Sequence, residues 1–405
     1  MAWAGPFSVD HRLEGVRSLQ RFMPLLARLR KEGCQRDRAG NRDLFFDHIC
    51  GLILLTFFNP SLESLRDLNK ASRLKQVKKK LGCSEASLGS LSESLRVFEP
   101  ERLVEIIQEL LGKLPDSPTA DERLKTLGRI PTAVDGTLLR QLPQITQACF
   151  ASRKDRGWKL HTHFEVLRGA ATFAKVTDAS GKGEASEKAV LRGSLEADRC
   201  YITDRGYEQF SLFNAIVRAG SSYVCRVKQD HHFTTESSLE RSSEAILAGV
   251  QEDSLGKMGS EKSQRIEHPA HLQRRLVVKL PPHPKRTGRK RNEDLELVLV
   301  TNLLDAPAEV VVLLYRFRWM IELFFRWLKC VLSCRHLVSQ SERGIQIQMY
   351  CALIACLMIQ LATGSDLRPN QWTYKLICLY LQGLADEGEL IQHLEERIAA
   401  AKQPD

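Results

Sequence analysis

The pattern of apolar and polar positions divides the chain into a helical first part and a mixed remainder. Up to about residue 120 the apolar residues recur at helical spacing, as in "NRDLFFDHICGLILLTFF" (residues 41–58) and "EPERLVEIIQELLGKL" (residues 99–114). From about Arg129 onward, short apolar runs bounded by Gly, Asp and Ser predict strands. Strands and helices that alternate in this way predict the α/β class, with mixed α+β character.

Several of these strand predictions have clear limits. Residues 158–179 predict an antiparallel pair that turns at Arg168-Gly169. A helix is expected at residues 208–219, and the further strand candidates are "SYVCRVK" (222–228), "RRLVVKL" (274–280) and "DLELVLVTNL" (294–303). Residues 229 to about 270 are rich in Ser, Glu and Gln, and we interpret them as an insertion.

The segment "YRFRWMIELFFRWLK" predicts a helix whose polar side chains share one narrow stripe. At about 100° of rotation per residue, Tyr315, Arg318, Glu322, Arg326 and Lys329 fall within about 80° of one another. The other positions are apolar, which predicts burial around most of the helix. An ion pair between Arg318 and Glu322 explains the stripe simply. A metal-binding or phosphate-binding acid beside cations is the alternative, and the helix alone does not decide between them.

Two aspartates come at the ends of predicted buried strands. Asp135 in "AVDGT" and Asp204 in "ITDRGY" each follow an apolar run and precede a glycine within two residues. One such Asp is usually a turn former. Together with Glu322, however, the two could hold two Mg²⁺ ions about 4 Å apart for phosphodiester cleavage and transfer, with Mn²⁺ as a substitute.

Composition and charge narrow the class of protein. The 405 residues suffice for two or three domains, and the net charge of +10, partly clustered at residues 73–80 and 283–291, favours a polyanionic partner. The N-terminus lacks the pattern of a secretory signal, and the longest apolar runs are short for a bilayer. We therefore expect a soluble, cytoplasmic protein that does not enter a membrane. The 11 cysteines lie mostly in apolar segments, which favours reduced core thiols over disulfides.

Residues 73–98 carry a basic run followed by a turn and a second helix. Lys78, Lys79 and Lys80 precede the turn at Gly82-Cys83-Ser84, and the next helix is expected from about Ala86. A helix-turn-helix that binds DNA and a pair of packed helices with solvated lysines both fit this pattern. His161 and His163 alternate along a predicted strand, and we expect them to pack or hydrogen-bond rather than bind metal.

The spacing Tyr315-x2-Arg318-x3-Glu322-x6-Lys329 resembles the signature of insertion-sequence DDE transposases of the IS-four family. Asp135 and Asp204 resemble the first and second catalytic aspartates of that family. "VTNL" (300–303) and "RGIQIQ" (343–348) stand where similar phrases usually fall. The resemblance covers about residues 128–365.

The resemblance implies an RNase H-like catalytic core with a β-rich insertion, preceded by an all-helical N-terminal domain and followed by C-terminal helices. The long gap between Asp204 and Glu322 has room for the insertion. The divisions that we expect are 1–120 (helical, DNA-binding), 121–228 (core, first part), 229–303 (β-rich insertion), 304–365 (core, second part, with the catalytic Glu) and 366–405 (C-terminal helices).

The same resemblance implies the reaction and the partners. Family members bind the terminal inverted repeats of their element, cut the DNA with Mg²⁺ and join its 3′ ends to target DNA, usually as a homodimer. Asp135, Asp204 and Glu322 would be metal ligands, whereas Tyr315, Arg318 and Lys329 would hold phosphates, with Arg326 beside them. The rival interpretations are a decayed transposase that acts as a DNA-binding repressor and a metal-dependent nuclease without strand transfer. A two-carboxylate glycosidase would not need the cations.

Overall fold

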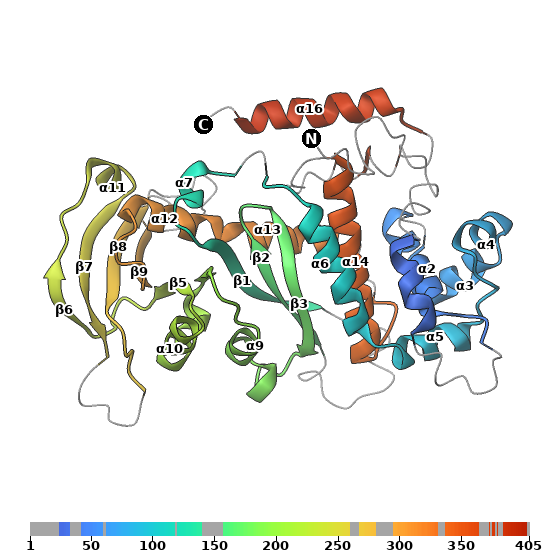
Figure 1. The fold of residues 1–405 in the computed structure, drawn as a ribbon, viewed down its shortest axis with the longest axis horizontal. Helices are drawn as coiled ribbons and strands as arrows, with labels where there is room; N and C mark the ends of the chain where they lie inside the picture. The colour runs from blue at the N-terminus through green and yellow to red at the C-terminus, as the bar shows by residue number, and fades with distance from the viewer. Residues whose placement is uncertain are drawn as a thin grey trace, which may run out of the picture.

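The computed structural model describes most of the chain and shows a single large sheet flanked by helices (Figure 1). The described residues are 24–32, 42–59, 62–117, 120–139, 157–259, 267–280, 295–330, 337–363, 372, 375–376, 379 and 384–402. The basic cluster at residues 283–291 lies outside them. The predicted mixed α+β class is confirmed.

The helical first part and the sheet follow one another along the chain as expected. The helices before the sheet are η1 (Arg28–Lys31), α2 (Phe46–Phe58), α3 (Leu65–Ser72), α4 (Lys75–Leu81), α5 (Leu88–Val97), η3 (Pro100–Leu103), α6 (Val104–Lys113) and α7 (Glu122–Lys125). The strands are β1 (Ile130–Leu139), β2 (Trp158–Glu165), β3 (Ala170–Asp178), β4 (Arg199–Thr203), β5 (Ser222–Val227), β6 (Phe233–Ser238), β7 (Val250–Met258), β8 (Gln273–Leu280) and β9 (Leu295–Thr301).

Further helices lie between and after the strands. They are η4 (Gly183–Ala185), α9 (Glu187–Gly193), η5 (Arg205–Tyr207), α10 (Phe210–Arg218), α11 (Ser243–Leu247), α12 (Ala308–Phe317), α13 (Trp319–Cys330), α14 (Glu342–Thr363) and α16 (Glu387–Lys402). The segment that we interpret as an insertion, from residue 229 onward, contains the strands β6, β7 and β8 and is mainly β. These strands extend the same sheet beyond β9.

The nine strands run in the order β3-β2-β1-β4-β5-β9-β8-β7-β6. Strand β1 is parallel to β4, and β4 is parallel to β5, whereas the other neighbours are antiparallel. The central parallel strands are buried on both faces, which explains why β4 is an apolar run without alternation. Cys200, Tyr201 and Ile202 are each 0% exposed.

Helix α14 has an apolar sequence because it lies in the protein core. It is 22 residues long, and Glu342–Leu361 is long and apolar enough to cross a membrane, although 94% of the apolar window is buried inside the protein. The expectation that every apolar run is too short for a bilayer is therefore wrong for this helix. The helix is nevertheless buried inside the protein, because it packs against α2, α5, α6 and β3.

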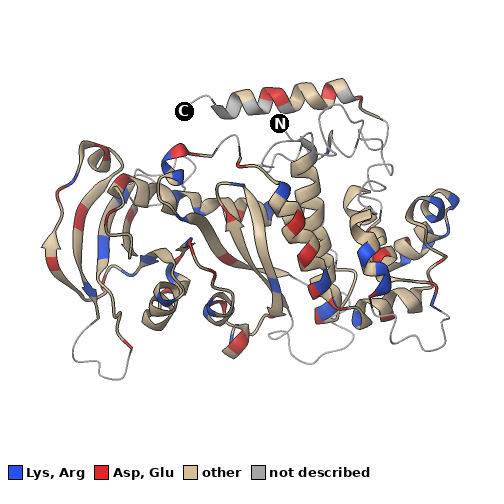
Figure 2. Cartoon of the chain, in the orientation of Figure 1, with Lys and Arg blue, Asp and Glu red and all other residues tan. Residues whose placement is uncertain are grey.

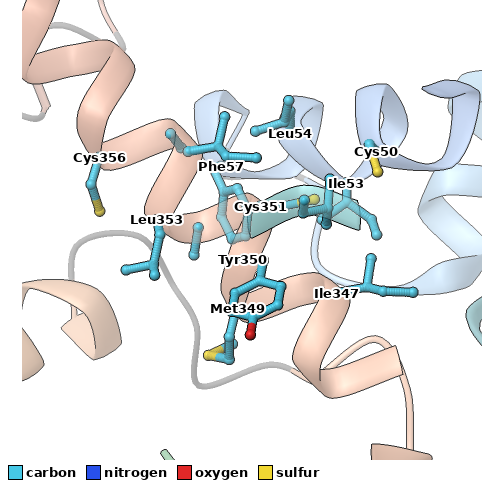
Figure 3. Packing of buried hydrophobic residues seen from close by; sticks show 14 of the residues in the cluster. Cys50, Ile53, Leu54, Phe57, Ile347, Met349, Tyr350, Cys351, Leu353 and Cys356 are labelled. Carbon is cyan, nitrogen blue, oxygen red and sulfur yellow. The ribbon is translucent and has the colours of Figure 1, made fainter. Parts of the chain in front are cut away.

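The N-terminal helices and the sheet share one hydrophobic core. Figure 3 shows Cys50, Ile53 and Phe57 of α2 packed beside Tyr350 and Cys351 of α14. The same cluster continues to the β2–β3 pair and to α13. No break in this core marks residue 120 among the described residues, and the division of the chain there stays a prediction.

The edge strand β3 is covered by side chains of α14. The amide of Gln346 accepts a hydrogen bond from the backbone N–H of Val176 at 2.5 Å and donates one to the carbonyl of Ala174 at 3.2 Å. Gln360 donates to the carbonyl of Gly169, in the β2–β3 turn, at 2.8 Å. Gln346 thus satisfies backbone groups that a further strand would otherwise pair. This contact gives the "RGIQIQ" phrase a structural role.

His161 and His163 lie on one face of β2, where they make hydrogen-bond and packing contacts as predicted, and both are buried. His161 Nε2 is 2.8 Å from Thr177 Oγ1, and the His163 ring packs against Phe173 and Tyr201. Burial lowers the pKa of His161 to about 4 and that of His163 to about 3, and nearby cations add to both effects. Both rings are therefore neutral in the folded protein at neutral pH.

These two histidines should make the fold sensitive to acid. The unfolded chain takes up a proton on each near its ordinary pKa of about 6.5, whereas the folded chain does not until far lower pH. We expect the free energy of unfolding to fall as pH drops from about 6.5 towards 4, by up to about 1.4 kcal/mol per pH unit for each histidine. Urea titrations at pH 7, 6 and 5 measure this, and His163→Phe should remove one proton's share of the slope. An unchanged slope in that variant would contradict the assignment.

Candidate active site

The register of β1 and β4 brings two of the predicted acids together. The parallel pairing runs from Ile130 opposite Arg199 to Ala133 opposite Ile202. Asp135 and Asp204 each follow the last of these pairs by two positions, so they lie near the same level where the pairing of the two strands ends. The Asp204 charge raises the pKa of Asp135, which is consistent with this proximity.

Asp135 does not end its strand, which corrects the prediction from the sequence. Strand β1 continues to Leu139 because it keeps pairing with β2, where Asp135 is opposite Thr162. Only the parallel pairing with β4 stops before Asp135. Asp204, in contrast, does follow its strand directly and caps η5, where its side chain accepts a hydrogen bond from the Gly206 N–H at 2.8 Å.

The segment 315–329 is two helices and not the one predicted. Helix α12 ends at Phe317 and α13 begins at Trp319, with Arg318 at the joint (Figure 1). The Arg318 N–H bonds to the Tyr315 carbonyl, and the Ile321 N–H bonds to the Arg318 carbonyl, so the spacing tightens from four residues to three. Helix α12 packs on β4 and β5, whereas α13 packs on β1 and β2. The joint therefore lies near the strands that carry Asp135 and Asp204.

Arg318 links two of the candidate acids. Its guanidinium donates to Glu322 Oε1 at 2.6 Å and lies 3.9 Å from Asp135 Oδ2. These side chains are only partly exposed, at 15% for Arg318, 31% for Glu322 and 23% for Asp135. The predicted ion pair between Arg318 and Glu322 is present, and the same guanidinium also reaches the sheet.

The Asp135 carboxyl has an unusual environment. Burial raises its pKa to about 6, and the charges of Asp204 and Glu187 act in the same direction. The Gly136 N–H, which donates to Asp135 Oδ1 at 2.7 Å, and the charge of Arg318 oppose the rise. Negative charge is thus concentrated at this end of β1 and is only partly compensated by cations.

Lys329 and Tyr315 also lie near β1 and Arg318. Lys329 Nζ donates to Thr137 Oγ1 at 2.6 Å, and Thr137 shares the face of β1 that carries Asp135. The Arg318 guanidinium is 5.9 Å from the centre of the Tyr315 ring. Burial raises the pKa of Tyr315, and hydrogen bonds with Arg318 and Arg226 oppose this. Arg326 is exposed on α13.

Other residues near the site were missed in the sequence. Glu187 and Lys159 form an ion pair of 2.5 Å against Gly136, the residue after Asp135. Glu187 lies in a polar stretch of the sequence, and the sequence gives no sign that it contacts Gly136. Thr137 could have been inferred, because it is two positions from Asp135 on a strand. Trp319 is 51% exposed directly after Arg318.

The carboxylates suit a divalent cation but are not gathered into a complete metal site. Among the residues that the structure describes, no three His, Cys, Asp or Glu side chains are close enough to hold a metal ion. Asp135 and Asp204 are neighbours, whereas Glu322 is turned to Arg318. Carboxylate oxygens are the ligands that Mg²⁺ prefers, and the partly uncompensated charge at Asp135 is one that such an ion would neutralise.

The predicted basic helix and turn are present in the N-terminal part. Helix α4 ends at Leu81 and is followed by Gly82, which has the left-handed φ of 62°, and Ser87 caps α5 through the Ser90 N–H. Lys79 is exposed, and Lys78 is 3.8 Å from Glu85, while the side chain of Lys80 lies outside the described residues. Figure 2 shows Lys and Arg on α4, at the end of the molecule away from β6–β8. Whether this surface binds DNA stays a prediction.

A family model described as the transposase DDE domain matches residues 127–358, which is more than half of the chain. The chain belongs to the DDE transposase family. The matched range includes Asp135, Asp204 and Glu322, and the predicted resemblance to insertion-sequence DDE transposases is confirmed.

Relatives of this DDE transposase chain carry matching names. A Sinorhizobium fredii protein named as the transposase y4zB is 26% identical over 208 residues, 51% of this chain and 54% of that protein. A Geobacillus stearothermophilus protein named as a transposase for insertion sequence element IS5377 is 26% identical over 164 residues, 40% of this chain and 39% of that protein. The matches thus span about half of the relatives' length or less.

A solved structure of the piggyBac transposase synaptic complex with hairpin DNA aligns with 97% of this chain and 86% of that chain. The TM-score is 0.40 and the identity is 10%, which is too low to equate the two folds.

Removing the guanidinium of Arg318 should destabilise the DDE transposase fold. Arg318→Gln leaves Asp135 and Glu322 without their shared partner, and we expect a loss of about 1–3 kcal/mol in the free energy of unfolding. Arg318→Lys should restore only part of it, because an ammonium does not span two carboxylates as a fork. Urea unfolding at pH 7 measures both variants. The matched control is Arg316→Gln on the exposed side of α12, expected within about 0.5 kcal/mol of the unmutated protein.

Proposed function

We propose that this chain is a cut-and-paste transposase. It binds the terminal inverted repeats of its insertion sequence and catalyses metal-dependent DNA cleavage and strand transfer. The observation that carries the proposal is that Asp135 and Asp204 directly follow the parallel pairing of β1 with β4, while Arg318 lies between Asp135 and Glu322. The match of residues 127–358 to the transposase DDE domain supports this assignment.

We also propose that the core is RNase H-like and comprises residues 121–228 and 304–365. The order β3-β2-β1-β4-β5, in which β1, β3, β4 and β5 run in one direction and β2 runs in the opposite one, supports this. In this proposal the strands β6, β7 and β8 belong to the β-rich insertion, and β9 ends it beside β5.

The proposed cofactor is a pair of Mg²⁺ ions, for which Mn²⁺ would substitute. Such ions activate a water or a 3′-hydroxyl and stabilise the leaving oxygen of a phosphodiester. Asp135 and Asp204 would be the fixed ligands, because the strand register and the hydrogen bonds from Gly136 and Gly206 orient them. Glu322 would join them by giving up its bond to Arg318, a change within reach of a partly exposed side chain.

The cations near the site would hold the DNA backbone. Arg318, released from Glu322, would have a planar fork free for a phosphate. Lys329 on Thr137, Tyr315 near Arg318 and exposed Arg326 would be further phosphate contacts. The partner is double-stranded DNA, both transposon ends and target, with the protein acting as a homodimer on it. The α4 surface, with Lys78, Lys79 and Lys80, would be a second DNA contact.

Three conservative substitutions test the proposal. Glu322→Gln, Asp135→Asn and Asp204→Asn remove one negative charge each and keep most of the side-chain volume. We expect each variant to fold and to bind end DNA, yet to lose cleavage and joining by roughly three orders of magnitude or more, since metal ligation contributes several kcal/mol. A labelled duplex with the element's terminal repeat is followed through binding, nicking and strand transfer with Mg²⁺ or Mn²⁺.

The control is Glu236→Gln on the exposed strand β6, which should react like the unmutated protein. Cleavage by the Glu322→Gln variant at near the normal rate would remove Glu322 from the ligand set. Tight binding without any cleavage by the unmutated protein would favour a decayed, repressor-like transposase. Cleavage without joining would favour a nuclease.

A salt titration separates the two proposed DNA contacts. Lys329→Ala and Lys79→Ala should each weaken end binding and reduce the slope of log affinity against log salt by about one phosphate contact. Lys257→Ala, on the exposed side of β7, is the control with an unchanged slope. A normal slope in either test variant would show that the lysine concerned does not touch a phosphate. Fluorescence anisotropy on a labelled end duplex between 50 and 300 mM salt gives these slopes.

A further inference from the structure

Thr162 is the residue directly opposite Asp135 in the sheet. Strand β2 is antiparallel to β1, and the register of the two strands pairs Thr162 with Asp135. Directly opposite residues on antiparallel strands have their side chains on the same face of the sheet, with β-carbons about 5 Å apart. The Thr162 hydroxyl therefore lies on the face of the sheet that carries the Asp135 carboxylate.

The neighbours of Thr162 on this face of β2 and β3 are apolar. Leu160 and Phe164 lie two positions before and after it on β2. Its partner on β3 is Ala174. All three are buried in the core cluster that also contains residues of α13 and α14. A valine has nearly the shape of a threonine and would bury no polar atom here. Packing alone thus does not require the hydroxyl.

The Thr162 hydroxyl is buried without a hydrogen bond. Thr162 is 0% exposed, and its Oγ1 has no partner among the residues that the structure describes. The hydroxyl of Thr137, on the same face of β1, accepts a hydrogen bond from Lys329 at 2.6 Å. A buried hydroxyl without a partner lowers the stability of the fold. It is explained if another state of the site supplies the partner.

The Asp135 carboxylate can supply that partner. Its Oδ1 accepts a hydrogen bond from the Gly136 N–H, and its Oδ2 lies 3.9 Å from the Arg318 guanidinium. A carboxylate has about four lone-pair positions, so Asp135 can accept from a hydroxyl and still ligate a cation. Because the β-carbons are only about 5 Å apart, rotation of the two side chains brings the hydroxyl to hydrogen-bond distance from the carboxylate.

We propose that Thr162 is a positioning residue of the carboxylate site, whose hydroxyl donates to the Asp135 carboxylate when Asp135 binds a divalent cation and so fixes the orientation of that ligand. The inference rests on the metal site proposed above. It assigns to Thr162 no contact with the cation or with DNA. Hydrogen bonds of this kind orient metal ligands, and their loss typically weakens metal affinity by about tenfold or more.

The experiment compares the stability of the metal-free full chain with its affinity for Mn²⁺, measured by the paramagnetic resonance signal of free Mn²⁺. Thr162→Val removes the hydroxyl and keeps most of the volume. The urea midpoint of the metal-free protein should stay the same or rise, because an unsatisfied polar group is gone. The dissociation constant for Mn²⁺ should nevertheless rise roughly tenfold.

Thr162→Ser makes the opposite change, because it keeps the hydroxyl and removes a methyl group. Its urea midpoint should fall, since the lost methyl leaves space in a packed core. Its Mn²⁺ affinity should stay within about twofold of the unmutated protein, because the hydroxyl is still present. A purely structural residue would not separate stability from metal affinity in this way.

The matched control is Ser254→Ala on β7. Ser254 also buries a hydroxyl that has no partner among the described residues, and β7 lies several strands from β1. Mn²⁺ affinity should not change in this variant. If Thr162→Val does not fold, Thr162→Ala and Thr162→Ser make the same comparison, because these two variants differ only in the hydroxyl.

Two results would overturn the inference. One is a Thr162→Val variant that folds and binds Mn²⁺ as tightly as the unmutated protein. The other is a Thr162→Ser variant that binds Mn²⁺ as weakly as Thr162→Val, because the methyl group and not the hydroxyl would then matter. Asp135→Asn distinguishes this failure from failure of the proposed function. If Asp135→Asn also leaves Mn²⁺ affinity unchanged, the carboxylate metal site itself is absent.

Discussion

The parallel pairing of β1 with β4 is the constraint on which the site depends. The two strands are far apart in the sequence, and the β2–β3 hairpin and α9 lie between them along the chain. Their register nevertheless fixes Asp135 and Asp204 at one level. A shift of one residue would turn one carboxylate to the opposite face of the sheet. The continuous burial of β4 resists such a shift, because its apolar side chains pack on both faces.

The second half of the site depends on the helix break at Arg318, which lies between two cores. Helix α12 packs into the cluster formed with β4, β5, β8 and β9, and α13 packs into the cluster that includes α14 and the N-terminal helices. Met320 contacts both clusters. Arg318 lies between α12, which packs in the first of these clusters, and α13, which packs in the second. The packing of both helices therefore determines where the Arg318 guanidinium lies. Changes in the N-terminal helices could therefore reach Arg318 through α14 and α13.

The sequence was sufficient for what is encoded locally. Apolar runs gave the strands, and the spacing of Tyr315, Arg318, Glu322 and Lys329 gave the family. Contacts between distant segments could not be predicted from the sequence. They are the pairing of Asp135 with Thr162 of β2, the hydrogen bond of Lys329 to Thr137 and the approach of Glu187 to Gly136. The break at Arg318 was also missed. Helical periodicity assumes a constant turn, whereas packing on two cores decides where the turn tightens.

The glutamines of α14 have a consequence for how copies of this chain can meet. A sheet with two open edges can add further copies without limit, because each edge presents unpaired N–H and C=O groups. Here Gln346 occupies backbone groups of β3 at one edge, and β6, whose pairing with β7 shifts register between Thr235 and Ser237, forms the other. Gln346 therefore hinders the addition of a strand at β3 and leaves β6 as the more open edge among the described strands. A contact of β6 with β6 of a second copy would close across a twofold axis and would not continue into a fibre.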